Sequence, residues 1–424
     1  MELKTYRELP IKEIYDFIVV GGGASGLFFA ASLNLNGYRG IIIESSTISG
    51  KKLLATGGGR CNFTHDGSIK DFLYHYHSKS KNITQFVRSP LYKFNNKSIV
   101  TFFENLGIDS YVQSDDRIFP SSNKASTIRN ALLKKCKDNS WTFSLSSSVI
   151  NIEKIYEGFI VESSDENIFF TKNLIVASGG PALLNPDCLN ILDLLSKFGI
   201  EIIKPIPSLT PIKISNFNIS KLSGISFENA EIRIISEQNC KTLYKETGPL
   251  IITETGFSGP LILNASGIIN PLIDKGKAFS LEIYPDINIF KSKYDFRGVN
   301  LSLSNAIREF SNLPERYVKY YCGEFSQAKA SSVPHKQIDS IISNMLRLQY
   351  PSSLILEPTF NDAMSSLGGV SLEEINNKSF QCKSLKGLYV IGEALDISGD
   401  TGGYNLQFMW SSAHAAASHL MLSL

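Results

Sequence analysis

The chain has 424 residues, a length that predicts two or three domains with a sizeable core. Its formal net charge is +2, with 43% hydrophobic and 19% charged residues, which is the balance of an ordinary globular protein. These values exclude a disordered chain and a disulfide-stapled miniprotein, and they give no reason to expect a nucleic-acid or membrane partner.

The first predicted unit is a buried strand over 16–20, a glycine turn, and a core-facing helix over 24–35. The turn over 21–26 reads G-x-G-x-x-G. A second apolar strand over 40–43 ends in Glu44, close to the spacing of about 20 residues at which an acid binds a ribose hydroxyl. Gly21 permits the tight turn, Gly23 lets a pyrophosphate approach, and Gly26 lets helix and strand pack closely. The pattern predicts a dinucleotide at the start of the helix, with a plain glycine turn as the alternative.

The nearly uncharged run over 17–35 is not predicted to be a signal or membrane segment. Three glycines interrupt it, and the sixteen residues before it carry mixed charges rather than a short basic region. We therefore expect a cytoplasmic protein that does not enter a membrane.

A second glycine-dense loop follows over 50–62, with the sequence G-K-K-L-L-A-T-G-G-G-R-C-N. It is not a P-loop, because no glycine stands at the required position before Lys51 and no Ser or Thr follows the lysines. A second loop would be superfluous for NAD(P), whereas FAD must be held well beyond its pyrophosphate. The loop therefore favours FAD, and an exposed flexible turn is the alternative.

Two later segments also favour FAD. A buried strand over 173–176 ends in Ala-Ser-Gly-Gly, as expected where a strand meets a cofactor. A strand that begins at 387 leads into Gly392-Glu393, then into Asp396, Gly402-Gly403 and an alanine-rich helix. We expect Asp396 to bind ribityl hydroxyls, and the amides of 405–407 at the start of the helix to face the pyrimidine edge of the flavin. The alternative is a purely structural strand, turn and helix.

Several motifs together resemble a bacterial flavoprotein family that includes aminoacetone oxidase and bile-acid 3-dehydro reductase, a branch of the two-dinucleotide-binding-domain flavoproteins. The similarity covers most of the chain. The motifs are G-K-K-L-L-A-T-G-G-G-R-C-N at 50–62, R-I-F-P-S-S at 117–122, G-F-S-G-P at 256–260, L-G-G-V at 367–370, and G-L-Y-V-I-G-E-A-L-D-I-S-G-D-T-G-G-Y-N-L-Q at 387–407.

The resemblance implies an α/β fold in which a Rossmann-like FAD-binding domain is assembled from both ends of the chain. We expect this domain over 1–204 and 360–424, and an inserted β-rich, barrel-like domain over 205–359 with a helical subdomain at about 291–350. Short β-rich runs over 210–214, 230–235 and 279–284 agree with this plan. So does a helical pattern over 301–348, with Ile338, Ile341, Ile342, Met345 and Leu346 on one face.

The expected cofactor contacts lie at the ends of the predicted strands, in the two glycine loops and at the start of the last helix. They are Gly21, Gly23, Ala24, Ser25, Gly26, Glu44, Ser45, Lys52, Leu53, Thr56, Gly57, Gly58, Gly59, Arg60, Cys61, Asn62, Val149, Ala177, Ser178, Gly179, Gly180, Gly392, Glu393, Asp396, Gly402, Gly403, Tyr404, Asn405, Leu406 and Gln407.

Three side chains are weak candidates for a catalytic role. Cys61 follows Arg60 and would have to be a thiolate of low pKa, although a packed cysteine is commoner. Arg117 would bind an anionic substrate, or else pair with the neighbouring acids. Tyr404 would donate a proton. We predict no metal, because the cysteines lack zinc-ligand spacing and His75 and His77 would point to different faces of a helix.

The sequence departs from the family in the segment 181–188, P-A-L-L-N-P-D-C, where a longer glycine-containing loop is expected, and at His65, where an Asn is expected. The substrate is therefore not transferred from the family.

We predict a FAD-dependent oxidoreductase acting on a small molecule by hydride transfer at flavin N5. No second dinucleotide-binding unit is visible, so the redox partner is dioxygen or transiently bound NAD(P)H. An RNA-modifying flavoprotein and a FAD-binding protein with little turnover are the alternatives. We expect no nucleic-acid partner, and the oligomeric state stays open.

Overall fold

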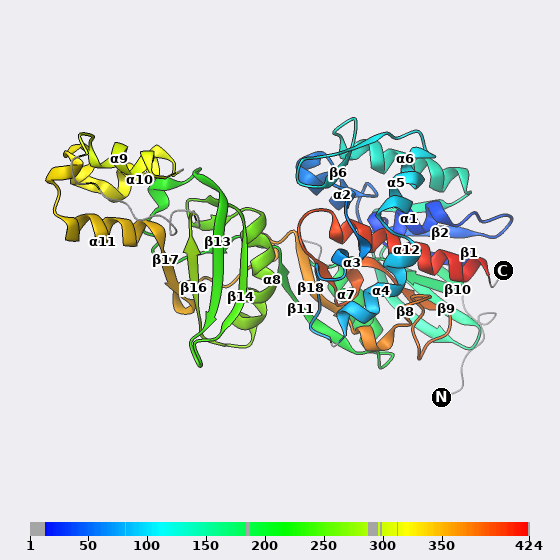
Figure 1. Cartoon of the computed structure of the whole chain (residues 1–424). Coiled ribbons are helices and arrows are strands. Elements are labelled where there is room, and N and C mark those ends of the chain that lie inside the picture. The colour runs from blue at the N-terminus through cyan, green and yellow to red at the C-terminus, as the bar shows by residue number, and fades with distance from the viewer. Residues whose placement is uncertain are drawn as a thin grey trace. The chain divides into compact units, whose positions relative to one another are not determined.

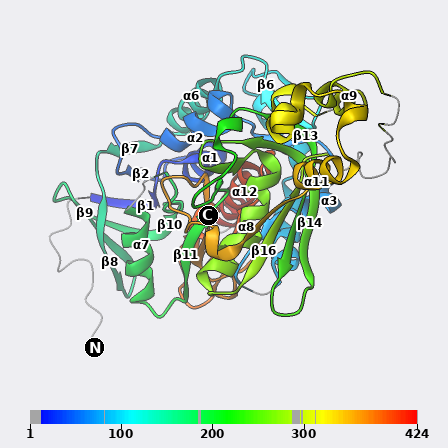
Figure 2. The same ribbon diagram turned by 90° about the vertical axis from the view of Figure 1, so that its left-hand side faces the viewer.

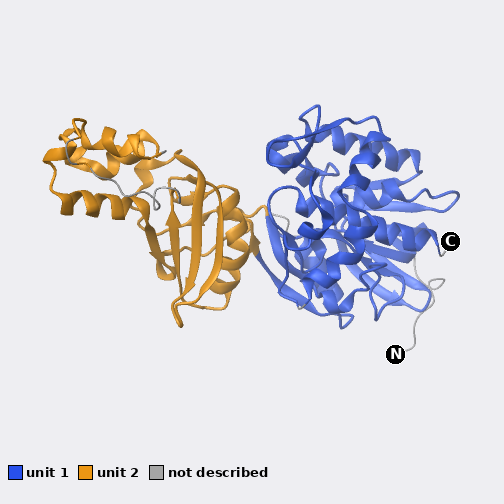
Figure 3. Ribbon diagram, viewed as in Figure 1, with its two compact units in different colours: residues 1–206, 365–424 blue, residues 207–364 orange. Residues whose placement is uncertain are grey.

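The computed structural model of the chain describes residues 13–80, 82–183, 187–286, 296, 299–311 and 313–422. It divides into two compact units (Figure 3). Unit 1 comprises 1–206 and 365–424, and unit 2 comprises 207–364. The start of the expected helical subdomain, 291–295, lies outside the described residues, as do 184–186 of the departing segment.

Unit 1 is built around a seven-stranded sheet with the order β7-β2-β1-β10-β9-β8, in which β19 also pairs with β10 (Figure 1). The strands β7, β2, β1, β10 and β19 are parallel, whereas β9 and β8 are antiparallel additions. The sheet strands are β1 (Glu13–Val20), β2 (Gly40–Glu44), β7 (Thr142–Leu145), β8 (Val149–Ile155), β9 (Gly158–Ser163), β10 (Ile168–Val176) and β19 (Leu388–Val390).

The parallel strands are apolar because helices and loops cover them. Phe17, Ile18 and Val19 of β1 are fully buried, as are Leu174, Ile175 and Val176 of β10. The helices of unit 1 are α1 (Ala24–Ser32), α2 (Lys51–Ala55), α3 (Ile69–Phe72), α4 (Ile83–Lys93), α5 (Asn96–Glu104), α6 (Ala125–Asp138), α7 (Asp187–Ser196) and α12 (Tyr404–Met421).

The helix α12 closes the chain and packs on α1, so the two ends of the chain share one core. Its alanines and serines allow this close approach, and Trp410 of α12 is fully buried against Phe28 of α1. Small sheets complete unit 1: β3 (Thr64–His65), β5 (Ser110–Val112) and β6 (Arg117–Pro120) form one, β4 (Tyr76–His77) pairs with β20 (Ser398–Gly399), and β11 (Ile202–Ser208) pairs with β18 (Ser365–Val370).

Unit 2 contains a six-stranded sheet with the order β12-β15-β14-β13-β16-β17. Its strands are β12 (Ile212–Lys213), β13 (Ser226–Ser236), β14 (Thr242–Ile252), β15 (Gly256–Ser258), β16 (Phe279–Tyr284) and β17 (Leu348–Pro351). An antiparallel bridge between Ile214 and Ile355 joins the segments that follow the two edge strands, which curls the sheet toward closure as a barrel-like insert requires.

Helices cover this sheet. Alternate residues of β13, Ala230, Ile232 and Ile234, are fully buried in a core shared with α8 (Pro260–Asp274), which packs on β14 and β13 (Figures 1 and 2). The remaining helices α9 (Leu303–Glu309), α10 (Glu315–Cys322) and α11 (His335–Leu346) form the helical part. On α11, the residues Ile338, Ile342, Met345 and Leu346 are buried and Ile341 is partly buried, so the expected apolar face is the packed one.

Candidate functional site

The carboxyl ends of the parallel strands bring four distant segments of unit 1 to one edge of the sheet. The amide of Gly21, just after β1, donates to the carbonyl of Ile43 in β2 at 2.8 Å. The amide of Ile391, just after β19, donates to the carbonyl of Val176 in β10 at 3.0 Å. This edge is where an open α/β sheet binds its ligand.

The glycines of the first turn differ in what surrounds them. A Cβ at Gly26 would lie 2.0 Å from the carbonyl oxygen of Gly21, and a Cβ at Gly21 would lie 2.5 Å from that of Ala177. Only glycine therefore permits this contact of helix, turn and strand. A Cβ at Gly23 would meet nothing within 4 Å.

The start of α1 fits a pyrophosphate. Its N-cap, Gly23, supplies no side-chain hydrogen bond, and no acidic residue lies in the first turn. The amides of Ala24 and Ser25 lie in the first turn, where backbone amides have no intrahelical partner, with the positive end of the helix dipole behind them, which is the arrangement that binds an anion.

Glu44 lies beside this turn at the end of β2. One carboxylate oxygen accepts from the amide of Gly22 at 2.7 Å and the other from the amide of Ser46 at 2.8 Å. The amide of Ser147 donates to the Glu44 carbonyl, which places the start of β8, with the buried Val149, next to the same strand end. Each carboxylate oxygen keeps accepting capacity for a ribose hydroxyl.

A second carboxylate at this edge belongs to Glu393, which is 9% exposed. One oxygen accepts from the amide of Ser366 at 2.9 Å, and the other lies 3.8 Å from the Lys52 ammonium. The same ammonium donates to the carbonyl of Gly180 at 2.7 Å. Lys52, Gly180 and Glu393, all expected cofactor contacts, are thus brought together by the fold.

Asp396 follows the same strand end in the chain and has one occupied and one unpaired carboxylate oxygen. Its side chain is fully buried, and one carboxylate oxygen accepts from the hydroxyls of Ser78 and Ser80 and from the amide of Ser80 at 2.7 to 2.8 Å. This oxygen fastens the segment 78–80 to the loop after β19. The other carboxylate oxygen, Oδ1, is buried without a hydrogen-bond partner, so the ribityl role of Asp396 stays a prediction, in which a ribityl hydroxyl would supply the missing partner.

The strand β3, which follows the second glycine loop, packs against the start of α12. Gly57, Gly58 and Gly59 adopt left-handed φ values of 57°, 66° and 85°, which explains their clustering. The hydroxyl of Thr64 donates to the side-chain oxygen of Gln407 at 2.6 Å, and a Cβ at Gly403 would lie 2.5 Å from the backbone of Thr64.

The start of α12 offers backbone amides but not all of those expected. Gly403 caps the helix without a side-chain hydrogen bond, which leaves the amides of Tyr404, Asn405 and Leu406 without intrahelical partners. The amide of Gln407, in contrast, donates to the carbonyl of Gly403 at 3.0 Å, and its side chain is fully buried. The amide of Gln407 is therefore already bonded within the helix. The side chain of Asn405 holds Gly399 by two hydrogen bonds of 2.7 and 2.8 Å.

The side chains of two further expected contacts, Leu53 and Cys61, are buried. Leu53 is 1% exposed and points into the core, so only its backbone faces the loop. Cys61 is fully buried, and burial raises its pKa to about 12, which is the opposite of a reactive thiolate.

The other two catalytic candidates also have structural partners. Arg117 forms an ion pair with Asp115 at 2.6 Å. Pairing with a neighbouring acid is one of its two predicted roles, the other being to bind an anionic substrate. Tyr404 is 5% exposed and lies between the rings of His65 and His75, at centroid distances of 4.9 and 4.1 Å. Burial, followed by the nearby Asp400, raises the pKa of the Tyr404 phenol.

A cluster of titratable groups that no sequence pattern predicted lies beside Tyr404. Asp400 accepts from His75 Nδ1 at 2.9 Å and from His77 Nε2 at 2.8 Å. The two histidines would point to different faces of a helix, but this segment is not helical: His77 belongs to β4, and His75 precedes it in a bend. The pairing of β4 with β20, which brings both histidines to Asp400, is a long-range contact that the local sequence does not reveal.

The departing segment 181–188 lies partly beyond the described residues. Pro181 and Ala182 are buried, and α7 begins at Asp187. In the part of the chain that is described, no helix is long and apolar enough to span a membrane. Over the same residues, no group of three or more His, Cys, Asp or Glu side chains is arranged to hold a metal ion.

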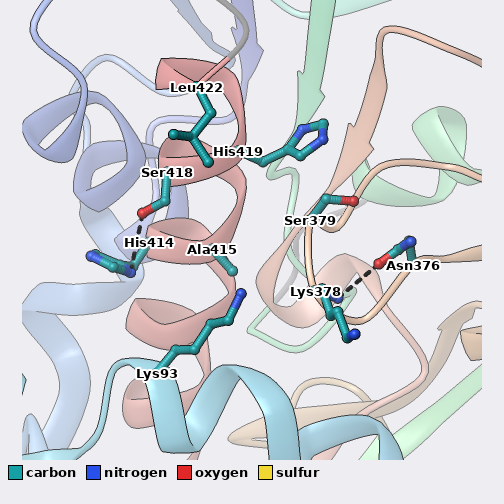
Figure 4. A pocket seen from close by; sticks show the side chains of 9 residues that line it. All are labelled: Lys93, Asn376, Lys378, Ser379, His414, Ala415, Ser418, His419 and Leu422. Carbon is teal, nitrogen blue, oxygen red and sulfur yellow. Dashed lines mark hydrogen bonds between the residues drawn. The ribbon is translucent and has the colours of Figure 1, made fainter.

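A cavity of about 240 Å³ lies elsewhere in unit 1, along the carboxyl-terminal half of α12 (Figure 4). Lys93, Lys378, His414 and His419 line it together with small and apolar side chains. None of the expected cofactor contacts belongs to it, so it is separate from the edge of the sheet described above.

Comparison with known proteins agrees with this architecture. The chain is 28% identical over 423 residues to the ribosomal RNA dihydrouridine synthase of Escherichia coli, covering 96% of this chain and 98% of the relative. It is 25% identical over 423 residues to the 3-dehydro-bile acid delta(4,6)-reductase of Clostridium scindens, covering 94% and 97%. A solved structure of 3-ketosteroid-delta4-(5alpha)-dehydrogenase from Rhodococcus jostii RHA1 matches 98% of this chain and 100% of its own chain at 10% identity, with a TM-score of 0.49.

The match to a protein family extends over nearly the whole chain. The HI0933-like protein Rossmann domain family matches residues 15–419, which takes in the glycine turn, the strand ends and α12. The chain therefore belongs to the HI0933-like family and is a FAD-dependent oxidoreductase.

Proposed function

We propose that the protein reduces a carbon–carbon double bond conjugated to a carbonyl group in a small molecule, with NAD(P)H as the electron donor. Bound FAD would supply the hydride from N5. The protein itself would contribute binding, orientation and a proton.

The observation that carries this proposal is the chemistry shared by two relatives with different substrates. Forming dihydrouridine adds two hydrogens to the double bond of uracil that is conjugated to a carbonyl. A 3-dehydro bile acid with double bonds at positions 4 and 6 also has its double bonds conjugated to a ketone. The two substrates differ in size and charge, so the common element is the activated double bond.

The described residues are suited to holding FAD for such a reaction. The open start of α1 would take the pyrophosphate, Glu44 the ribose, and Lys52 with Glu393 the linking chain. The amides at the start of α12 would stabilise negative charge at the pyrimidine edge. The second glycine loop would lie between these two regions.

A second candidate is reduction of uracil in RNA, favoured by the 28% identity that extends over nearly the whole chain. The net charge of +2 argues against a large phosphate-binding surface. The two candidates share the reaction and differ in the substrate, so one experiment separates them.

The experiment follows the bound flavin anaerobically in a stopped-flow instrument. NADH and NADPH are tested as reductants, and the reduced enzyme is then mixed with small enones, with uridine, or with unmodified ribosomal RNA. We expect reoxidation by an enone without dioxygen and a product two mass units heavier than the acceptor. Reoxidation by the RNA alone would select the second candidate, and reoxidation by dioxygen alone would contradict both.

A further inference from the structure

We propose that His75 is the proton donor of this reduction and that Asp400 positions it, an inference that rests on the proposed function. Reduction of a conjugated double bond needs a hydride at one carbon and a proton at its neighbour. A side chain that supplies the proton must lie beside the flavin site, be exposed, and keep one nitrogen for the substrate.

The backbone holds His75 by pairing two short strands. His77 of β4 pairs with Ser398 of β20, and Tyr76 pairs with Gly399. The amide of Asp400 then donates to the carbonyl of His75 at 2.8 Å. Asp400 and His75 are therefore joined by a backbone hydrogen bond as well as by a side-chain hydrogen bond, which fixes the geometry of the pair.

The side chains form a carboxylate–imidazole dyad. His75 Nδ1 lies 2.9 Å from one oxygen of Asp400, whose side chain is 13% exposed. A carboxylate at Nδ1 fixes the proton on that nitrogen and orients the ring, as in other acid–base sites. The side chain of His75 is 37% exposed, which leaves Nε2 available to a substrate.

Tyr404 connects this dyad to the expected flavin site. The rings of His75 and Tyr404 are stacked at 4.1 Å with an interplanar angle of 15°. Tyr404 is the first residue of α12, directly after the Gly402-Gly403 pair. The imidazole is thus held against the helix start whose amides would face the flavin.

The neighbouring groups are less suitable donors. His77 uses Nε2 for Asp400 and its side chain is 24% exposed. His65, whose ring also stacks on Tyr404, is held by the carbonyl of Gly402, and burial lowers its pKa, which favours the neutral form. Tyr404 itself is buried with a raised pKa.

The step balances as follows. The hydride from reduced FAD forms a C–H bond at the carbon β to the carbonyl. The Nε2–H bond of His75 breaks, and its proton forms a C–H bond at the α carbon with the electron pair of the former double bond. The substrate gains two electrons and two hydrogens, NAD(P)H restores the reduced cofactor, and water reprotonates His75.

The test compares His75→Gln with His77→Gln, which loses a hydrogen bond to the same carboxylate, and with Asp400→Asn. In anaerobic stopped flow, His75→Gln should slow reoxidation by the enone about 100-fold or more, the usual contribution of a general acid. Its reduction by NAD(P)H and its FAD content should stay at the wild-type level. Asp400→Asn should show a smaller loss, and added imidazole should partly restore His75→Gln.

A second measurement does not depend on turnover. Diethyl pyrocarbonate should modify His75 in the oxidised holoenzyme, and the enone should protect it, while the exposed His335 of unit 2 serves as the reference within the same mass spectrum.

Equal losses in His75→Gln and His77→Gln would overturn the proposal, because both histidines would then only hold the loop. An unchanged rate in His75→Gln, or no protection of His75 by the enone, would overturn it as well. Failure of the wild-type enzyme to pass electrons to any conjugated double bond would instead contradict the proposed function, and this inference with it.

Discussion

A Cβ at Gly26 would lie 2.0 Å from the carbonyl oxygen of Gly21, whereas a Cβ at Gly23, between them, would meet nothing. The same turn thus contains glycines required by packing and one whose free space faces the expected ligand. This contrast allows folding and cofactor binding to be tested separately.

We expect Gly26→Ala to destabilise unit 1 by about 1–3 kcal/mol or more, the cost of overpacking. Gly23→Ala should leave the apoprotein as stable as the wild type and weaken FAD binding. Urea unfolding followed by tryptophan fluorescence measures the first effect, because Trp141 and Trp410 both belong to unit 1. Equal destabilisation by the two substitutions would contradict the packing argument.

Replacing Glu44 with Ala should weaken FAD binding by about 1–3 kcal/mol, the cost of losing a hydrogen bond to a charged group. The carboxylate also holds the amides of Gly22 and Ser46, so the apoprotein should lose some stability as well. Titration of the apoprotein with FAD measures the change in affinity. Glu153→Gln on the exposed side of β8 is the matched control, and an unchanged affinity in Glu44→Ala would remove Glu44 from the ribose site.

Thiol labelling should distinguish the cysteines. All six are free and only Cys240 is exposed. Burial raises the pKa of Cys61 to about 12, so we expect Cys240 to react with Ellman's reagent at pH 8 at once and Cys61 only after unfolding. Cys240→Ser should abolish the fast phase. Fast labelling of Cys61 in the folded protein would reopen its redox role.

Acid should weaken the contribution of Asp400 to stability. Burial would raise the pKa of this carboxyl, but hydrogen bonds from His75 and His77 outweigh burial and lower it below the ordinary value of 3.8. A lowered acid pKa stabilises the fold above the unfolded-state pKa, and this stabilisation is lost as the pH falls through the folded-state pKa. The difference in the free energy of unfolding between wild type and Asp400→Asn should therefore shrink below about pH 4. A difference that does not change with pH would contradict the dyad.

Local patterns in the sequence were sufficient for the parts of the fold that depend on neighbours along the chain. The strand and the helix predicted on either side of the glycine turn are β1 and α1. Their bounds are close to those expected, although α1 ends at Ser32 rather than at residue 35. The strand predicted over 279–284 is β16, and the apolar face predicted for α11 is buried.

Roles that depend on distant contacts were predicted less well. Nothing near Asp396 in the sequence indicates that Ser78 and Ser80, more than 300 residues earlier, bond one of its carboxylate oxygens. His75 and His77 were assigned a helical period because β4, a strand of two residues, gives no readable alternation. Their partner, Asp400, is equally remote in the sequence.

The chain leaves unit 1 along β11 and returns along β18, and these two strands pair with each other. At the start of unit 2 the carbonyl of Leu209 accepts from the amide of Met364 at its end, at 3.3 Å. A domain whose two ends lie next to each other can be inserted into a second domain, or removed from it, without separating the strands of that second domain. A short glycine linker in place of 210–363 should therefore leave a Rossmann domain able to fold alone, and the insert itself is a natural candidate for circular permutation.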